Sequence, residues 1–392
     1  MNIERIQELL RNEGLVGWLL ADFQGINSIA CRVARLEGMI TRRWFCLIPA
    51  EGPISWIYSR VEPGLFTDRP GHRFPYAGYE DLDRVLTQVL PGEGRLAMEY
   101  SPRGALPTAS RVDAGTFERI RTLCPSLDIV SSCELLQSYV ALWTPEGLAS
   151  HHRAVDHLIR LKDEALAAVE QSLQTGTYLS ECSIQNLLVE GFQKADLITN
   201  HPPIVAVDEH AGNPHYAPHP DQDRRIEPNR VLLIDLWAKE NGPESVYADI
   251  TWMAYTGSTV PAPVQKAWEA VRDGRDAALR LAQERFARNQ RVEGWELDRI
   301  TRDLITSRGY GENFVHRTGH SLGLEDHADG ANLDDYESRD TRPLIPDTGF
   351  TIEPGVYLPE FGIRSEIDVF IGPHGPEATT PCQESIDTIP PH

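Results

Sequence analysis

The chain has 392 residues and a formal net charge of −21, and its apolar fraction is ordinary for a globular protein. The length favours two domains or one large one, and the negative charge argues against nucleic acid and anionic membranes as partners. Six cysteines without regular spacing are expected to be reduced thiols, and they stand at positions 31, 46, 124, 133, 182 and 382. The charged, amphipathic start and the lack of a run of 18 apolar residues argue against a signal peptide and a membrane span, so the cytoplasm is the expected location.

The first part of the chain alternates between helical and strand patterns, which predicts an α/β domain over residues 1–140. Helices are predicted at 3–12, 80–90 and 113–123, and strands at 15–21, 44–50, 54–59, 95–100 and 127–131. This part holds no convincing catalytic constellation. We expect it to mediate dimerisation and to form one wall of the cleft, with a linker around 140–147.

The second part, residues 145–392, repeats one order of elements. A helix pair at 146–173 and 179–193 precedes a hairpin at 231–253, and a pair at 262–286 and 294–307 precedes a hairpin at 350–371. Each hairpin carries two carboxylates. Folding at the turns is expected to make Asp235 and Asp249 cross-strand neighbours, and likewise Glu353 and Glu366. Two hairpins related by a pseudo-twofold axis would direct four acids to one place.

The stretch from His316 to His327, HRTGHSLGLEDH, contains three histidines in twelve residues. His316 and His320 have the i, i+4 spacing of a zinc-binding helix, but Arg317 stands where that motif has glutamate, and Gly319 disfavours a helix interior. A tight loop or strand that passes close to a buried site is expected instead. Taken alone, such a cluster is more often structural or exposed than a ligand set.

Four acids in apolar segments make a metal-binding role for the histidines more plausible than a structural one. Unpaired charges inside a protein cost several kcal/mol each, so four such carboxylates indicate bound cations. The sequence therefore predicts a metal site made of Asp235, Asp249, His320, Glu353 and Glu366. An oxygen-rich set with one histidine suits Mn²⁺, Co²⁺ or Fe²⁺, with Zn²⁺ also possible, and two ions balance four carboxylates.

The order Asp, Asp, His, Glu, Glu, with GH before LGL, IEPGVY and IRSEID, resembles the methionine aminopeptidase, aminopeptidase P and prolidase superfamily of metallopeptidases (family M24). The match covers roughly residues 145 to 385. The resemblance implies an α/β (α+β) fold, in which a creatinase-like N-terminal domain precedes a pita-bread catalytic domain. The preceding segment resembles the N-terminal domain of the creatinase, prolidase and aminopeptidase P branch.

The resemblance also implies how the five ligands divide between two ions. Asp249 and Glu366 would bridge the ions, Asp235 would complete one, and His320 with Glu353 would complete the other. Glu353 is further implied to take a proton from the attacking water and pass it to the leaving nitrogen.

Four more residues match positions near the substrate. His215, in NPHYAP, resembles a substrate-binding histidine, although a capping or exposed residue is an alternative. His327 resembles the histidine that contacts the scissile carbonyl or the tetrahedral intermediate. Arg364 is implied either to bind a substrate carboxylate or to support the acids. Tyr357 either lines the pocket or belongs to the core.

Several departures from the family pattern predict a reshaped pocket. The two aspartates are farther apart in the sequence than usual. Trp237 replaces a common glycine, Trp252 an arginine and Ser321 a glycine, and Ala328 follows His327 where an acid is usual. Trp237 shares a strand face with Asp235, so its indole could reach the site.

The predicted function is dinuclear metal-dependent hydrolysis of Xaa-Pro dipeptides by a homodimer, with a small peptide as the partner. The first alternative is an Xaa-Pro aminopeptidase that acts on longer peptides. A second is a small-molecule hydrolase or lyase on the same scaffold, although creatinase-like enzymes do not keep this metal set. A third is a binding module derived from a peptidase, which the intact ligand set disfavours.

Overall fold

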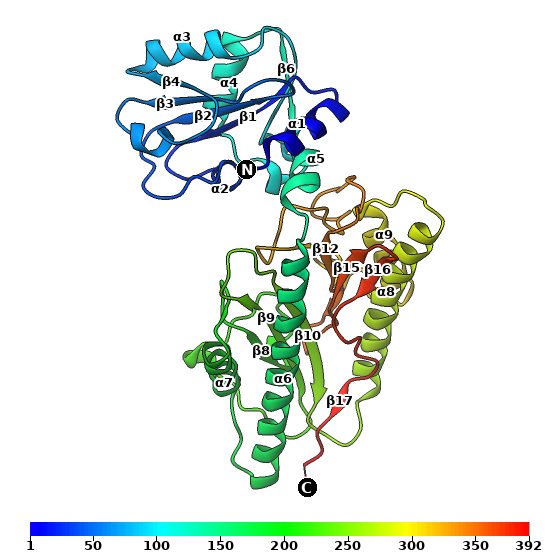
Figure 1. The fold of residues 1–392 in the computed structure, drawn as a ribbon. Coiled ribbons are helices and arrows are strands. Elements are labelled where there is room, and N and C mark those ends of the chain that lie inside the picture. Colours follow the sequence, from blue (N-terminus) through cyan, green and yellow to red (C-terminus); the bar gives the residue numbers. More distant parts are fainter. Residues whose placement is uncertain (392) are drawn as a thin grey trace. The chain divides into compact units, whose positions relative to one another are not determined.

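The computed structural model describes residues 1–391, which form two compact units, Met1–Val140 (unit 1) and Ala141–His392 (unit 2). Unit 1 contains a mixed six-stranded sheet with the order β4-β3-β2-β1-β5-β6 (Figure 1). Its strands are β1 Gly17–Asp22, β2 Trp44–Pro49, β3 Ser55–Ser59, β4 His72–Tyr76, β5 Gly94–Met98 and β6 Leu127–Ser131. Its helices are α1 Ile3–Asn12, α2 Ser28–Ala34, α3 Tyr79–Val89, α4 Ala114–Leu123 and α5 Cys133–Leu135. All six residues of β1 are buried, as expected for a central strand that is covered on both faces.

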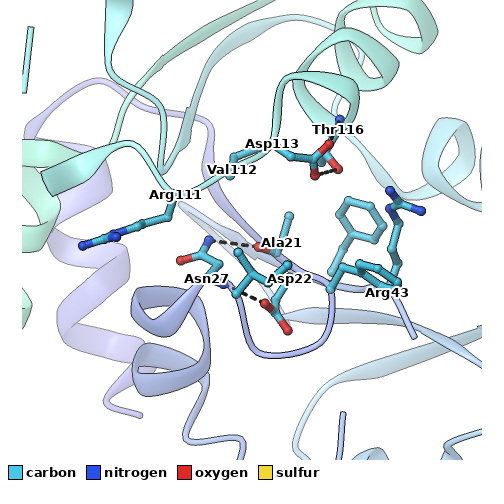
Figure 2. A pocket seen from close by; sticks show the side chains of 11 residues that line it. Ala21, Asp22, Asn27, Arg43, Arg111, Val112, Asp113 and Thr116 are labelled. Atoms are coloured by element: carbon cyan, nitrogen blue, oxygen red, sulfur yellow. Dashed lines mark hydrogen bonds between the residues drawn. The ribbon is translucent and has the colours of Figure 1, made fainter. Parts of the chain in front are cut away.

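A pocket of about 100 Å³ lies at the end of β1 in unit 1. Figure 2 shows Asp22 and Asn27 on one side of it and Asp113 with Thr116 on another. Asp22 accepts a hydrogen bond from the backbone N–H of Asn27 at 2.8 Å, and the Asn27 amide donates to Ala21 O at 2.9 Å. Asp113 caps α4 by accepting from the Thr116 backbone N–H at 2.9 Å. These polar groups therefore fix the turn after β1 and the start of α4.

Unit 2 is built from long helices, two hairpins and short pairing strands. Its helices are α6 Pro145–Thr175, α7 Glu181–Lys194, α8 Ala262–Ala287 and α9 Gly294–Ser307. The strands are β7 Leu197–Ile198, β8 Ile204–Val207, β9 Val231–Glu240, β10 Ala248–Tyr255, β11 Ser321–Leu322, β12 Gly349–Ile352, β13 Gly355–Tyr357, β14 Gly362–Arg364, β15 Ile367–Gly372, β16 Gly375–Ala378 and β17 Asp387–Thr388. Among residues 1–391, no helix combines the length and the apolar character needed to cross a membrane.

Helix α6 covers the first hairpin, and α8 covers part of the second (Figure 1). Helix α6 begins where Thr144 accepts a hydrogen bond from the Gly147 N–H at 3.0 Å, with Pro145 in the first turn. It ends at Gly176, whose φ of 66° lies in the left-handed region that glycine adopts without strain. The apolar face between these caps packs on β9 and β10 and fixes the plane of the hairpin.

The register of the first hairpin places its two aspartates on one face. In the β9–β10 ladder, Asp235 lies opposite Thr251, and Asp249 lies opposite Trp237. The two aspartates are therefore cross-strand neighbours on one face, as expected, and they are diagonal to each other rather than directly opposed. The seven residues between the strands set this register, and their conformation cannot be read from turn residues alone.

The second hairpin matches the predicted pairing but is interrupted. Ile352 pairs with Ile367 at the end of one ladder, and Gly355 pairs with Arg364 at the start of the next. Glu353 therefore lies opposite Glu366 at the break between the ladders. Pro354 lacks a backbone N–H, which explains why the ladder stops beside Glu353.

Candidate metal centre

The two hairpins and the loop that carries His320 bring three of the five predicted ligands into one buried cluster. Asp249, His320 and Glu366 each offer a donor atom, and these atoms lie within 4.8 Å of one another. The hairpins meet because β10 packs beside β15 (Figure 1). Two contacts hold them in register: the Asp249 backbone N–H donates to Asp368 Oδ2 at 2.9 Å, and Thr251 Oγ1 donates to Glu366 Oε2 at 2.8 Å.

His320 reaches the cluster from an extended loop, as the sequence predicts. A Cβ at Gly319 would lie 2.0 Å from Thr351 O, so glycine is required where this loop crosses β12. His320 Nδ1 lies 3.2 Å from Ser321 O, which places the ring proton on Nδ1. The free Nε2 then faces Glu353 Oε1 at 3.2 Å and Asp249 Oδ2 at 3.9 Å. That lone pair is available to a metal ion.

Asp235 joins the site through Arg364. The guanidinium NH2 of Arg364 binds Asp235 Oδ2, Nε donates to Thr251 Oγ1 at 3.0 Å, and NH1 donates to the Tyr357 hydroxyl at 3.1 Å and to Pro214 O at 3.3 Å. Arg364 is only 4% exposed. All three of its nitrogens therefore have partners within the protein.

The acids repel one another strongly. Burial first, and then the neighbouring Glu366 and Asp235, raise the pKa of Asp249 well above its usual value. The pKa of Glu366 is raised well above normal by burial and by Glu353 and Asp235. Burial raises the pKa of Glu353 to about 7. Burial also lowers the pKa of His320 well below its usual value, so its imidazole is neutral.

These residues fit a divalent cation. Within the described part of the chain, Asp249 Oδ1 is buried without a hydrogen-bond partner. Crowded carboxylates with an unsatisfied oxygen and a neutral imidazole need a positive charge at their centre. A metal ion supplies the missing partner for Asp249 and relieves the repulsion that raises the pKa values.

The structure also positions the predicted residues that are not ligands. The His327 ring centroid lies 4.1 Å from that of His320. His327 Nδ1 lies 3.3 Å from Arg317 NH2. Because a guanidinium can only donate, Nδ1 accepts and the neutral ring carries its proton on Nε2. His327 therefore has a donor N–H on the side away from Arg317.

His215 is exposed on the loop that follows β8. Its proximity contributes to lowering the pKa of Asp235, against the larger raising effect of burial. This loop is held by Glu181, which is fully buried and accepts from the backbone N–H of Val207 at 2.7 Å and from the Tyr216 hydroxyl at 2.7 Å. Glu181 thus fixes the residue next to His215.

Several supporting residues were not identified from the sequence. The sequence named Tyr357 as a pocket or core residue but not its contacts: it is buried, and its hydroxyl lies 2.7 Å from His316 Nε2, so it connects Arg364 to the start of the histidine loop. Thr351 Oγ1 lies 3.3 Å from Glu353 Oε1 and accepts from the His320 backbone N–H at 3.1 Å. Thr251 and Thr351 are two positions from a predicted ligand, so the period of a strand could have identified them. The Asp368 contact crosses between hairpins and has no such signal.

A buried set of carboxylates and one histidine, held by two antiparallel hairpins, defines a domain suited to binding divalent cations. The profile of metallopeptidase family M24 matches residues 153–373. The chain belongs to this family, as the five ligand motifs predict.

Known relatives agree with this assignment. An Xaa-Pro dipeptidase of Lactobacillus helveticus is 30% identical over 202 residues, which are 50% of this chain and 50% of that protein. The chain thus spans about half the length of the curated relatives that it matches. A dipeptidase of Mycobacterium ulcerans superposes with a TM-score of 0.76 at 18% identity, over 99% of this chain and 97% of the other.

A third relative is an X-prolyl aminopeptidase of Caenorhabditis elegans, a cytosolic enzyme with a di-nuclear active site. It has a TM-score of 0.67 at 18% identity, over 98% of this chain and 62% of the other. The two structural likenesses confirm the predicted fold class, an α/β domain followed by a pita-bread domain.

Proposed function

We propose that the chain is a dinuclear metal-dependent Xaa-Pro dipeptidase. The observation that carries the proposal is the buried cluster of Asp249, His320 and Glu366, with Glu353 Oε1 3.2 Å from the His320 imidazole, in a member of family M24. The substrate class is supported by the relatives, which include an Xaa-Pro dipeptidase and an X-prolyl aminopeptidase.

Five residues would hold the two ions, namely Asp235, Asp249, His320, Glu353 and Glu366. Mn²⁺ is the proposed metal, with Co²⁺, Zn²⁺ and Fe²⁺ as alternatives for this donor set. Bound ions would supply Lewis-acid polarisation of the peptide carbonyl and activation of the attacking water. Arg364 would orient Asp235, and its permanent positive charge opposes the effect of burial, which raises the pKa of Asp235.

Glu353 is suited to carry the proton. Its side chain is 18% exposed, compared with 9% for Asp249 and 4% for His320, so it is the one of the three that a substrate can most easily reach. In this proposal Glu353 takes the proton from water and delivers it to the proline nitrogen.

His327 would stabilise the developing oxyanion. Its ring lies beside His320, and the Arg317 contact leaves an N–H on Nε2 to donate. A preorganised donor aimed at developing charge is worth about 10²- to 10³-fold in kcat. His215 would contact the substrate from its exposed loop, where it can meet the dipeptide carboxylate.

An Xaa-Pro aminopeptidase is the second candidate, because Arg364 is already engaged by Asp235, Thr251 and Tyr357. A dipeptidase needs a cation or donors for the free carboxylate, and an aminopeptidase does not. Because the guanidinium of Arg364 already binds other protein groups, we favour a role in which Arg364 supports Asp235 over one in which it binds the substrate carboxylate. His215 then remains the candidate for that contact.

Steady-state kinetics on matched substrates tests the proposal. Gly-Pro, Gly-Pro-Gly and glycine amide would be assayed with Mn²⁺, Co²⁺ and Zn²⁺. The dipeptidase proposal expects the highest kcat/KM on Gly-Pro. Preference for the tripeptide would favour the aminopeptidase, and turnover of the amide alone would reject both.

The proposal includes a homodimer formed through unit 1 and a cytoplasmic location. The family assignment and the predicted α/β character of this unit support it. Multi-angle light scattering of the purified chain should give twice the 43.9 kDa chain mass, and a monomer mass would reject the dimer.

A further inference from the structure

Trp237 projects from the face of β9 that carries the metal-binding acids. It lies directly opposite Asp249 in the β9–β10 ladder, and it is two residues from Asp235. Alternation along a strand places all three side chains on one face, and directly paired residues have Cβ atoms about 4.5–5.5 Å apart. The indole therefore stands beside the cluster rather than in the opposite core.

The indole is held in place by a hydrogen-bonded bridge. Its Nε1–H donates to Asn200 Oδ1 at 2.7 Å, and the Asn200 amide donates to Asp326 Oδ2 at 2.8 Å. Asp326 immediately precedes His327 in the chain. The bridge thus connects β9 to the loop that presents the histidine nearest to His320.

A second contact fastens the same loop to β9. Lys239, two residues after Trp237, donates from Nζ to Leu324 O, and its ammonium lies 5.0 Å from the Tyr247 ring centroid. The Tyr247 backbone N–H donates to Gly323 O at 2.9 Å. Trp237 itself packs against the apolar cluster that includes Tyr247 and Leu322. The indole is therefore a rigid surface, since both its ring and its N–H are fixed.

The two ends of the hairpin face differ in chemistry. Arg364 binds Asp235 and Pro214 O, so the loop that carries His215 adjoins the Asp235 end. Because His215 is the candidate contact for the substrate carboxylate, this end suits the carboxyl side of a dipeptide. Trp237 adjoins Asp249 at the other end, where the bulk of the residue before proline would lie. The indole at this end is half-buried and fixed, so it would form a bulky boundary beside Asp249.

We propose that Trp237, fixed through Asn200 and Asp326, is a specificity-determining residue that restricts the position before proline to glycine, alanine and similarly small residues. The inference rests on the proposed Xaa-Pro activity. The inference predicts which substrate residues fit before proline, whereas the proposed function predicts that the metal cluster cleaves the bond. One of these can therefore be wrong while the other holds.

The test compares kcat/KM for Gly-Pro, Ala-Pro, Leu-Pro and Phe-Pro in the wild type, Trp237→Ala and Trp237→Phe. Removing bulk from an apolar pocket changes discrimination by about 10- to 200-fold. We expect Trp237→Ala to raise the ratio of Phe-Pro to Gly-Pro by at least about tenfold. Trp237→Phe, which keeps most of the ring, should keep the wild-type order. An unchanged ratio in Trp237→Ala, with Gly-Pro still cleaved, would overturn the inference and leave the proposed function intact.

If the alanine variant does not fold, Trp237→Leu serves the same purpose. Its ratio of kcat/KM for Phe-Pro to Gly-Pro should exceed the wild-type ratio, by less than the increase expected for alanine. If the wild type cleaves no Xaa-Pro peptide, the proposed function fails. In that case, thermal stabilisation by glycine hydroxamate and by phenylalanine hydroxamate, with Mn²⁺ present, tests directly whether Trp237 restricts the size of the bound side chain. The wild type should be stabilised more by the glycine compound, and Trp237→Ala or Trp237→Leu should reverse that order. Equal responses in wild type and variant would overturn the inference.

Discussion

Each unit buries a carboxylate beside a strand, and the two carboxylates have opposite surroundings. Glu99 in unit 1 is 0% exposed and accepts hydrogen bonds from Trp18 Nε1 at 2.5 Å, Asn27 Nδ2 at 2.8 Å and Ser132 Oγ at 3.4 Å. Asp249 in unit 2 is 6% exposed, and the described residues offer no hydrogen-bond partner to its Oδ1.

The causes of their pKa shifts separate these two acids. Burial raises the pKa of Glu99 to about 7, and its hydrogen bonds act in the opposite direction. At Asp249 the neighbours add to the effect of burial, because they are carboxylates. Burial alone therefore does not mark a metal site. A metal site is instead marked by carboxylates that converge on one another without hydrogen-bond donors. The contrast between Glu99 and Asp249 leads to predictions that differ between the two units.

Asp249→Asn should have the largest effect. It removes a proposed bridging ligand, so metal affinity should fall by more than the 10- to 100-fold that is typical of supporting residues, and turnover should be lost. In the chelated protein the same change should raise the melting temperature, since one repelling charge is gone. Metal analysis and calorimetry of both forms would check this. A chelated variant less stable than the chelated wild type would contradict the account of crowding.

Glu353→Gln should lower kcat by about 10²- to 10⁴-fold, the range of general acid–base catalysis. The amide keeps an oxygen for the metal but cannot take a proton, so substrate binding should change much less than turnover. Kinetics and metal content would be measured on the same sample. Unchanged kcat with metal bound would mean that another group carries the proton.

Arg364→Met should reduce metal affinity by about 10- to 100-fold, since the arginine orients Asp235 from behind. Activity on Gly-Pro and Gly-Pro-Gly should then fall together and recover in part with excess Mn²⁺. Arg364→Lys is the matched control because it keeps the charge and loses the planar fork. A loss confined to the dipeptide, with metal retained, would instead assign Arg364 to the substrate carboxylate.

Glu99→Gln should affect only the stability of unit 1. A carboxyl with a folded pKa raised from 4.5 to about 7 favours the fold below pH 4.5 and loses that contribution as the pH rises towards 7. The loss amounts to roughly 3 kcal/mol. The variant lacks this titration, so its stability relative to wild type should rise between pH 4.5 and 7. Hydrogen exchange in β5 would measure the difference, and a pH-independent difference would contradict it.

The sequence could predict those elements whose signals are local in the chain. Helix α1 was predicted with its observed bounds because its apolar spacing, start and stop are local signals. The strand β4, with the sequence HRFPY, was missed because it is a largely exposed edge strand with a proline and without an apolar run. The short α2 was missed because seven residues give too little periodicity.

Local pattern also located the acids but not all of their partners. The strand period around Asp235, Asp249, Glu353 and Glu366 was visible in the sequence. The pairing of Asp235 with Arg364 joins residues 129 positions apart, and the Asp249 contact with Asp368 spans 119. Such contacts depend on how the hairpins pack, so only the structure shows that Arg364 is already bound to Asp235, Thr251 and Tyr357.

The central claim is that the crowded acids of unit 2 hold the ions on which turnover depends. Exhaustive chelation, with metal content and Gly-Pro hydrolysis measured on one sample, tests it most directly. The account predicts that activity and about two divalent ions per chain are lost together, that the melting temperature falls, and that Mn²⁺ restores all three. Full activity at near-zero metal content would contradict it.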